Sequence, residues 1–234
     1  MSDAHSQNND HWCFAWYPGE APPADTATRA ALVDKNRWKK GSTIRVGFVD
    51  GTLAQQALVK RFAVGWTAPG IANLKFSWVP TAQADIRISF AYSGSWSVIG
   101  TSCKSVPKNQ PTMNFGWLTP GVTDQEAQRV ILHEFGHALG LIHEHQNPLG
   151  SINWNKPAVY HDLSGPPNNW DKATIDHNMF ETYPKQTIQG TTTDPSSIMM
   201  YPLPASWVNP PSLPVGLNSN LSTTDKTFIK KAYP

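Results

Sequence analysis

Hydrophobic and polar residues alternate in several short segments in the first half of the chain. The period of a half-buried strand occurs four times, at residues 44–48, 74–78, 86–90 and 113–117. In the first of these, Ile44, Val46 and Phe48 alternate with polar or small residues. A further segment, residues 94–100, is mostly polar and suits the edge of a sheet. The pattern therefore predicts five strands before residue 120.

Three other segments have the spacing of amphipathic helices. At each start an acid or amide stands three residues after a Ser or Thr, as in a capping box: Thr52/Gln55, Thr123/Glu126 and Ser222/Asp225. The second helix has the longest apolar face: Ala127, Val130, Ile131, Phe135, Ala138 and Leu139. Strands together with helices predict an α+β fold. Residues 1–40 and 144–220 show little periodicity.

Composition excludes some classes of protein. The formal net charge of +2 is too small to indicate a nucleic acid or an anionic membrane as partner. No apolar stretch is long enough to span a bilayer. Charged residues are only 15% of the 234, and 10 are Trp, which favours a secreted enzyme. Met1 to His5 are polar and lack the apolar core of a secretory signal, so this expectation rests on composition.

The strongest chemical signal is the run His-Glu-Phe-Gly-His-Ala-Leu-Gly-Leu-Ile-His at residues 133–143. His133 and His137 are four residues apart on a helix, so both side chains lie on one face. Glu134 is rotated by about 100° from His133, a poor position for a ligand but a good one for touching a metal-bound water. Gly140 lets the chain turn back sharply and bring His143 to the same place.

Three neutral imidazoles with one open position are typical of a catalytic zinc, whereas structural zinc sites are usually closed by thiolates. Zinc lowers the pKa of a bound water towards ~7. Glu134 would accept the proton of that water and pass a proton to the leaving amine. A bare His-Glu-x-x-His arises by chance on many helices, but Gly140 and His143 make the pattern specific. The motif predicts one catalytic Zn²⁺ and hydrolysis of an amide, most simply a peptide bond.

Beyond this motif, the chain resembles the metzincins, and among them the astacin-like enzymes of the bacterial and fungal type. Glu144 follows the third histidine directly, and Ser-Ile-Met-Met-Tyr at 197–201 is similar to the family's Met-turn. Residues 94–100 are similar to its upper-rim edge strand, and residues 221–233 resemble its last helix. Two features depart from the animal enzymes: Gln-Asn-Pro stands at 146–148, and there are two cysteines rather than four.

The resemblance implies an architecture and a domain organisation. The fold would be a twisted mixed five-stranded sheet with two long helices and a loop-rich C-terminal subdomain ending in a helix. Residues 1–40 would be an N-terminal extension or pro-segment. Residues 41–234 would form the metallopeptidase catalytic domain, with an upper subdomain of about 41–143 and a lower one of about 144–234.

The resemblance also implies roles for individual residues. The zinc ligands would be His133, His137 and His143, with Glu134 as the general base. Tyr201 would be a fifth, movable ligand that swings to stabilise the oxyanion. The structural residues would be Gly140, Met199, which forms the hydrophobic floor under the metal, and Glu144, a buried acid tied in the family to the mature N-terminus. Substrate would add as an antiparallel strand to Ser95, Trp96, Ser97 and Val98.

Other residues leave alternatives open. Cys13 and Cys103 could form a disulfide, both could be free thiols, or the thiolate of Cys13 could cap the zinc. We expect His145 to be a turn-exposed, hydrogen-bonded histidine rather than a fourth ligand.

Three functions compete. An endopeptidase that cleaves extended polypeptide is favoured by the edge strand, and we expect a monomer. A zinc-binding pseudo-enzyme would have no need of Glu134. A hydrolase of non-peptide amides would have no need of an edge strand.

Overall fold

A computed structural model of the protein describes residues 14–16, 36–166, 168–182, 193–212 and 214–234. A mixed sheet forms one side of it, with the strand order β1-β5-β6-β4-β2-β3. The strands are β1 (Phe14–Trp16), β2 (Thr43–Phe48), β3 (Lys75–Trp78), β4 (Ile86–Ser89), β5 (Ser95–Val98) and β6 (Met113–Phe115). Strand β5 is antiparallel to β6, and all other pairings are parallel.

The five strands β2 to β6 confirm the predicted mixed sheet. The alternating apolar residues of β2, β4 and β6 are buried in the core, except for the half-buried Phe48, whereas Phe76 and Trp78 of β3 are half-buried. Strand β1 is an addition that the pattern did not predict. It pairs with the outer side of β5, with Phe14 opposite Trp96 and Trp16 opposite Val98. The expected edge strand is therefore covered by a segment from residues 1–40.

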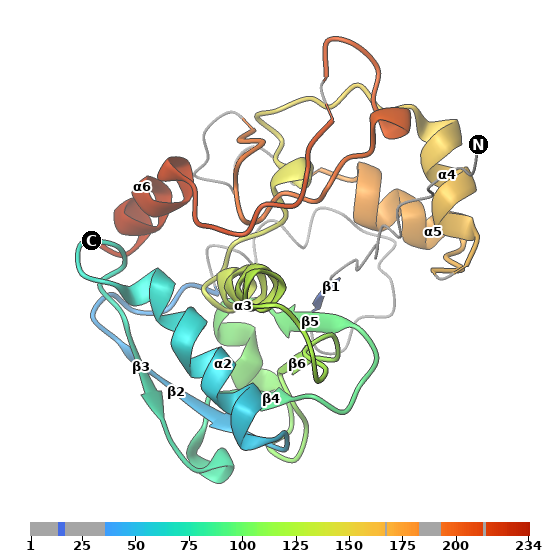
Figure 1. Ribbon diagram of the computed structural model, residues 1–234. Coiled ribbons are helices and arrows are strands. Elements are labelled where there is room, and N and C mark those ends of the chain that lie inside the picture. The colour runs from blue at the N-terminus through green and yellow to red at the C-terminus, as the bar shows by residue number, and fades with distance from the viewer. Residues whose placement is uncertain (1–13, 17–35, 167, 183–192, 213) are drawn as a thin grey trace.

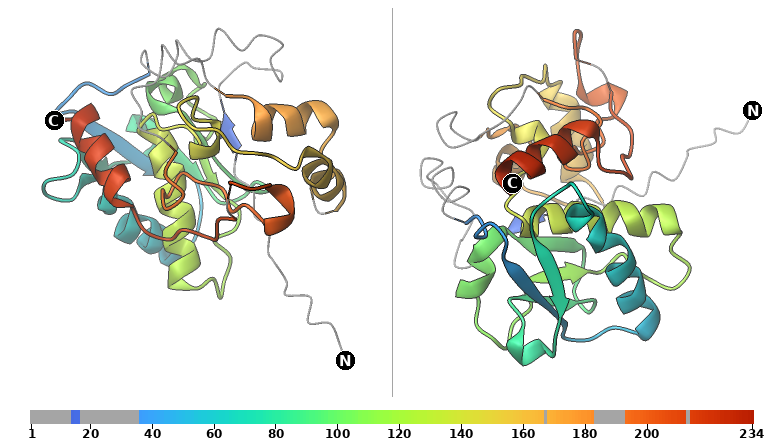
Figure 2. Two further views of the ribbon diagram at one scale, coloured as in Figure 1. Left: turned by 90° about the horizontal axis from the view of Figure 1, so that it is seen from above. Right: turned by 90° about the vertical axis from the view of Figure 1, so that its left-hand side faces the viewer.

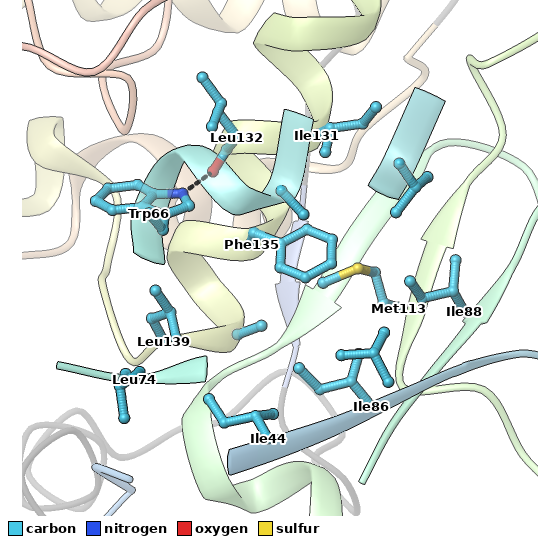
Figure 3. Packing of buried hydrophobic residues seen from close by; sticks show 14 of the residues in the cluster. Ile44, Trp66, Leu74, Ile86, Ile88, Met113, Ile131, Leu132, Phe135 and Leu139 are labelled. Atoms are coloured by element: carbon cyan, nitrogen blue, oxygen red, sulfur yellow. Dashed lines mark hydrogen bonds between the residues drawn. The ribbon is translucent and has the colours of Figure 1, made fainter. Parts of the chain in front are cut away.

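Helices α2 (Leu53–Ala63) and α3 (Asp124–Ala138) are the two long helices of this part. The capping box of α2 is complete. The α3 box is only half formed, because the Glu126 carboxylate pairs with Arg129 instead of reaching back to Thr123. Figure 3 shows Phe135 of α3 next to Met113 of the sheet, and Ile131 and Ile86 belong to the same buried cluster.

Residues after 143 build a second part with two smaller apolar clusters. Helices α4 (Lys156–Ser164) and α5 (Lys172–Ile175) were missed in the sequence because both are short. Val159 and Leu163, one turn apart on α4, are buried in the larger of these two clusters with Trp207. Figures 1 and 2 show α3 in the middle of the molecule, between the sheet with α2 on one side and α4 to α6 on the other.

The last helix, α6 (Thr223–Ala232), has the complete capping box that Ser222 and Asp225 predicted. Its inward residue Ile229 and the following Tyr233 pack into the core of the sheet side. Trp38 is buried in the same core, so ordered packing begins earlier than the strand pattern indicated. No helix within the described ranges is long and apolar enough to cross a membrane.

Candidate metal centre

The end of α3 carries the histidine motif and is held from both ends of the chain. The last carbonyls of a helix have no partner within it. Here Trp38 Nε1 donates to Ala138 O at 2.8 Å, and the Tyr233 hydroxyl donates to Leu139 O at 2.7 Å. Gly140 follows with φ of +100°, a conformation that only glycine adopts readily, and the chain turns back as predicted.

The turn brings the three predicted ligands together. One nitrogen from each of His133, His137 and His143 lies within 4.8 Å of the other two. The Nε2 atoms of His137 and His143 face each other at 3.1 Å. All three side chains are buried. Residues that are ten apart in sequence thus converge on one point.

Hydrogen bonds fix which nitrogen faces that point in two of the three rings. His133 Nδ1 donates to Ile198 O at 2.8 Å, and His137 Nδ1 donates to Leu141 O at 2.9 Å, because a carbonyl can only accept. The Nε2 lone pairs therefore point inward. Among the described residues, His133 Nε2 is buried without a hydrogen-bond partner. Converging, desolvated lone pairs fit a cation, and imidazoles whose other ring nitrogen donates to a backbone carbonyl are typical zinc ligands.

Burial keeps these imidazoles neutral, which is the form that can bind a metal ion. Desolvation lowers the pKa of His137 to about 4. The pKa values of His133 and His143 are held well below 6.5, first by desolvation and then by the neighbouring imidazoles. All three rings are therefore neutral at pH 7, as metal binding requires.

The Met-turn lies directly under the motif helix. A Cβ on Gly136 would collide with Met199 Sδ and would lie 3.1 Å from Trp66 Cζ2, so only glycine allows this approach. Trp66 is fixed in turn by donating to Leu132 O at 2.8 Å, as Figure 3 shows. Gly136 was not singled out in the sequence. The available signal was a glycine in a helix interior, which costs stability and needs a packing reason.

Tyr201 lies beside the ligands. Its ring centroid is 4.3 Å from that of His143 and 4.5 Å from that of His145. The expected exposure of His145 is wrong, because its ring is buried against Tyr201. The expected hydrogen bond is present, since His145 Nε2 donates to Asn178 O at 2.7 Å. Aromatic packing in the second part overrides the polar sequence context here.

Similar proteins identify the family. Neither a protein-family model nor a curated protein matches this sequence. A solved structure of myroilysin is 42% identical, covers 86% of this chain and 97% of that chain, and superposes with a TM-score of 0.82. The chain belongs to the astacin-like metzincins. It is therefore a zinc metalloendopeptidase that acts on polypeptides.

One further structure agrees with this assignment, and another shares the fold. A crystal structure of myroilysin is 38% identical and covers 97% of this chain and 92% of that chain, with a TM-score of 0.69. High choriolytic enzyme 1, a hatching enzyme zinc-protease from Oryzias latipes (Medaka fish), is 18% identical, with a TM-score of 0.55. It covers 84% of this chain and 93% of that chain, and it shows the shared fold alone.

The remaining predicted residues of this astacin-like enzyme have defined surroundings. Glu144 accepts from Asn147 Nδ2 and from the Asp194 backbone N–H, each at 3.0 Å. Burial raises the pKa of Glu144 to about 7. Cys103 is buried, and desolvation raises the pKa of its thiol to about 12. Cys13 and the start of the chain lie outside the described residues, so their predicted pairings stay predictions.

Proposed function

We propose that Glu134 is the general base and acid of this endopeptidase, with His133, His137 and His143 as the zinc ligands. One observation carries the proposal: three buried, neutral imidazoles converge within 4.8 Å at the end of the helix that also holds Glu134. The Glu134 side chain is fully buried on that helix. A binding module would have no need of a carboxylate there, which argues against a pseudo-enzyme.

The residues divide the chemistry between them. A zinc ion at this site would act as a Lewis acid and would lower the pKa of a bound water. Glu134 accepts a proton from the attacking water at its carboxylate and then delivers a proton to the leaving amine nitrogen. Tyr201 would be a fifth ligand at rest and would donate a hydrogen bond from its hydroxyl to the oxyanion. Met199 forms the hydrophobic floor under the metal site. Gly140 and Glu144 are structural residues of the turn that carries His143.

Substrate is proposed to bind as an extended strand along β5. The backbone of Ser95, Trp96, Ser97 and Val98 would pair with it on the side away from β6. The same side pairs with β1 in parallel, which supports its ability to accept a strand. A hydrolase of non-peptide amides would not need such a strand.

The position of β1 also supports residues 1–40 as a pro-segment. Phe14–Trp16 takes the place where an antiparallel substrate would pair, but runs in the opposite direction. The segment must leave before substrate binds, so the catalytic domain 41–234, with subdomains of about 41–143 and 144–234, would be latent while it stays. Proteolytic removal of the residues before 36 should raise kcat/KM on a peptide, and unchanged activity would contradict this.

We also propose a secreted monomer without nucleic-acid or membrane partners. The low content of charged residues and the net charge of +2 support this. Light scattering coupled to size exclusion, and assay of the culture medium of a producing cell, test the two statements separately.

The exchange Glu134→Gln tests the mechanism. The ligands stay while the proton acceptor is lost, so zinc content should stay at one ion and hydrolysis should nearly vanish. Metal analysis and a peptide-library assay read by mass spectrometry measure both, in wild-type and variant chains from which the residues before 36 have been removed. Glu126→Gln is the matched control, since it makes the same exchange near the start of the same helix, where Glu126 pairs with Arg129. Near-normal turnover in Glu134→Gln would contradict the assignment of Glu134 as the general base.

A further inference from the structure

Asp225 makes more contacts than a helix cap requires. In a capping box the acid at the third helical position accepts from the backbone of the cap residue, and Asp225 Oδ2 does so from Ser222 N at 2.9 Å. The same oxygen also accepts from Ile198 N at 2.8 Å, and Oδ1 accepts from Ser197 Oγ at 2.7 Å. Ser197 and Ile198 belong to the Met-turn, 28 and 27 residues earlier.

The other side of this turn contacts a proposed zinc ligand. Ile198 O accepts the hydrogen bond from His133 Nδ1 at 2.8 Å. Ser197 Oγ accepts from Met199 N at 3.0 Å, which closes the turn on itself. The segment 197–199 thus lies between Asp225 and His133. Partners of this kind set the tautomer and the orientation of a metal-bound histidine.

A second set of hydrogen bonds connects the Met-turn and the start of α6 to Glu144, the residue after His143. Met199 O accepts from the backbone N–H of Glu144 at 2.9 Å. Ser222 Oγ donates to Asp194 Oδ2 at 2.7 Å, and Asp194 N donates to Glu144 Oε1 at 3.0 Å. The start of α6 is therefore bonded to both segments that adjoin the histidines.

We propose that Asp225 is a positioning residue of the zinc site, which holds the Met-turn where Ile198 O orients His133. The inference rests on the proposed ligand role of His133. A role confined to capping α6 would need only the bond to Ser222. The side chain of Asp225 is buried and all three donors that face it are neutral, so its effect is one of geometry rather than of ion pairing.

Two substitutions separate geometry from charge. Asp225→Ala removes all three acceptor contacts. Asp225→Asn can keep its carbonyl on Ile198 N and Ser222 N while its amide donates to Ser197 Oγ, so it should restore the site. Thr52→Ala is the matched control, because it removes the capping box of α2, in which Thr52 bonds to Gln55 and Gln55 donates to Leu118 O.

The measurements are zinc affinity by chelator competition and the visible absorption of the Co²⁺-substituted full chain. Asp225→Ala should weaken zinc binding about 10–100-fold and alter the cobalt spectrum. Asp225→Asn and Thr52→Ala should match the wild type in both. Equal affinity and spectrum in Asp225→Ala and Thr52→Ala would overturn the proposal.

Two other outcomes can be distinguished from failure of the Asp225 proposal: a variant that does not fold, and a wrong assignment of the zinc ligands. If circular dichroism shows that Asp225→Ala does not fold, Ser197→Ala takes its place. This variant removes the hydrogen bond from Ser197 Oγ to Asp225 and leaves the α6 capping box intact. A wild-type affinity and spectrum in Ser197→Ala would then overturn the proposal. If the wild type itself binds no zinc, or His133→Ala binds it equally well, the ligand assignment fails instead.

Discussion

Replacing Gly136 by alanine sets two effects of opposite sign against each other. Alanine in a helix interior is favoured over glycine by ~1 kcal/mol. The added methyl would collide with Met199 Sδ and would lie 3.2 Å from Met199 Cε. The Met199 side chain is only 2% exposed, so it cannot swing away into solvent. Overpacking of this kind costs ~1–3 kcal/mol, and we expect a net loss of up to ~2 kcal/mol in the free energy of unfolding.

The sign should reverse when the colliding side chain is removed. Met199→Ala alone should cost ~2–5 kcal/mol, because it leaves a cavity under the motif helix. Adding Gly136→Ala to that variant should then stabilise it by up to ~1 kcal/mol, since the helix gains propensity and no sulfur is displaced. The double-mutant cycle therefore predicts a coupling of ~1–3 kcal/mol between the two positions.

Urea denaturation of the wild type, both single variants and the double variant measures this cycle in the metal-free protein, so that zinc linkage does not enter. Chelator competition on the same four proteins reports the site, and Gly136→Ala should weaken zinc because the Met-turn that contacts His133 is displaced. A stabilising Gly136→Ala in the wild type, or an equal cost in both backgrounds, would refute the close packing of Met199 on the helix.

Two further outcomes are expected. Tyr201→Phe should lower kcat by ~10²–10³, with a modest change in KM and unchanged zinc content, because the hydroxyl acts on charge that develops in the transition state; full kcat would reduce Tyr201 to a packing role. In the metal-free protein, desolvation lowers the pKa of His137 and His145 from 6.5 to about 4. Between these two pH values the unfolded chain therefore binds more protons than the folded chain, so the free energy of unfolding should fall as the pH drops from 6.5 towards 4. Equal urea midpoints at pH ~7.5 and pH ~5 would contradict this.

Local patterns in the sequence predicted the elements whose structure depends on neighbouring residues. The alternation at 44–48, 86–90 and 113–117 predicted strands β2, β4 and β6, and capping pairs marked the starts of α2, α3 and α6. Helices α4 and α5 were missed because nine and four residues give too few turns for a clear period.

The centre of the motif was also predictable, because it depends on one helix and one turn. The 3.6-residue repeat puts His133 and His137 on one face, and positive φ at Gly140 reverses the chain towards His143. These features are set within eleven consecutive residues. No distant contact is needed to foresee them.

What surrounds that centre was decided by packing between residues far apart in sequence. Trp38 and Tyr233 close the end of α3 from 100 and 94 residues away, and Ile198 O orients His133 across 65. Such partners depend on how the three apolar clusters bring distant segments together, and no local sequence period predicts this. The pairing of β1 with β5 and the burial of His145 belong to the same class, because hydrogen bonds and ring contacts form only where the whole fold places their donors and faces.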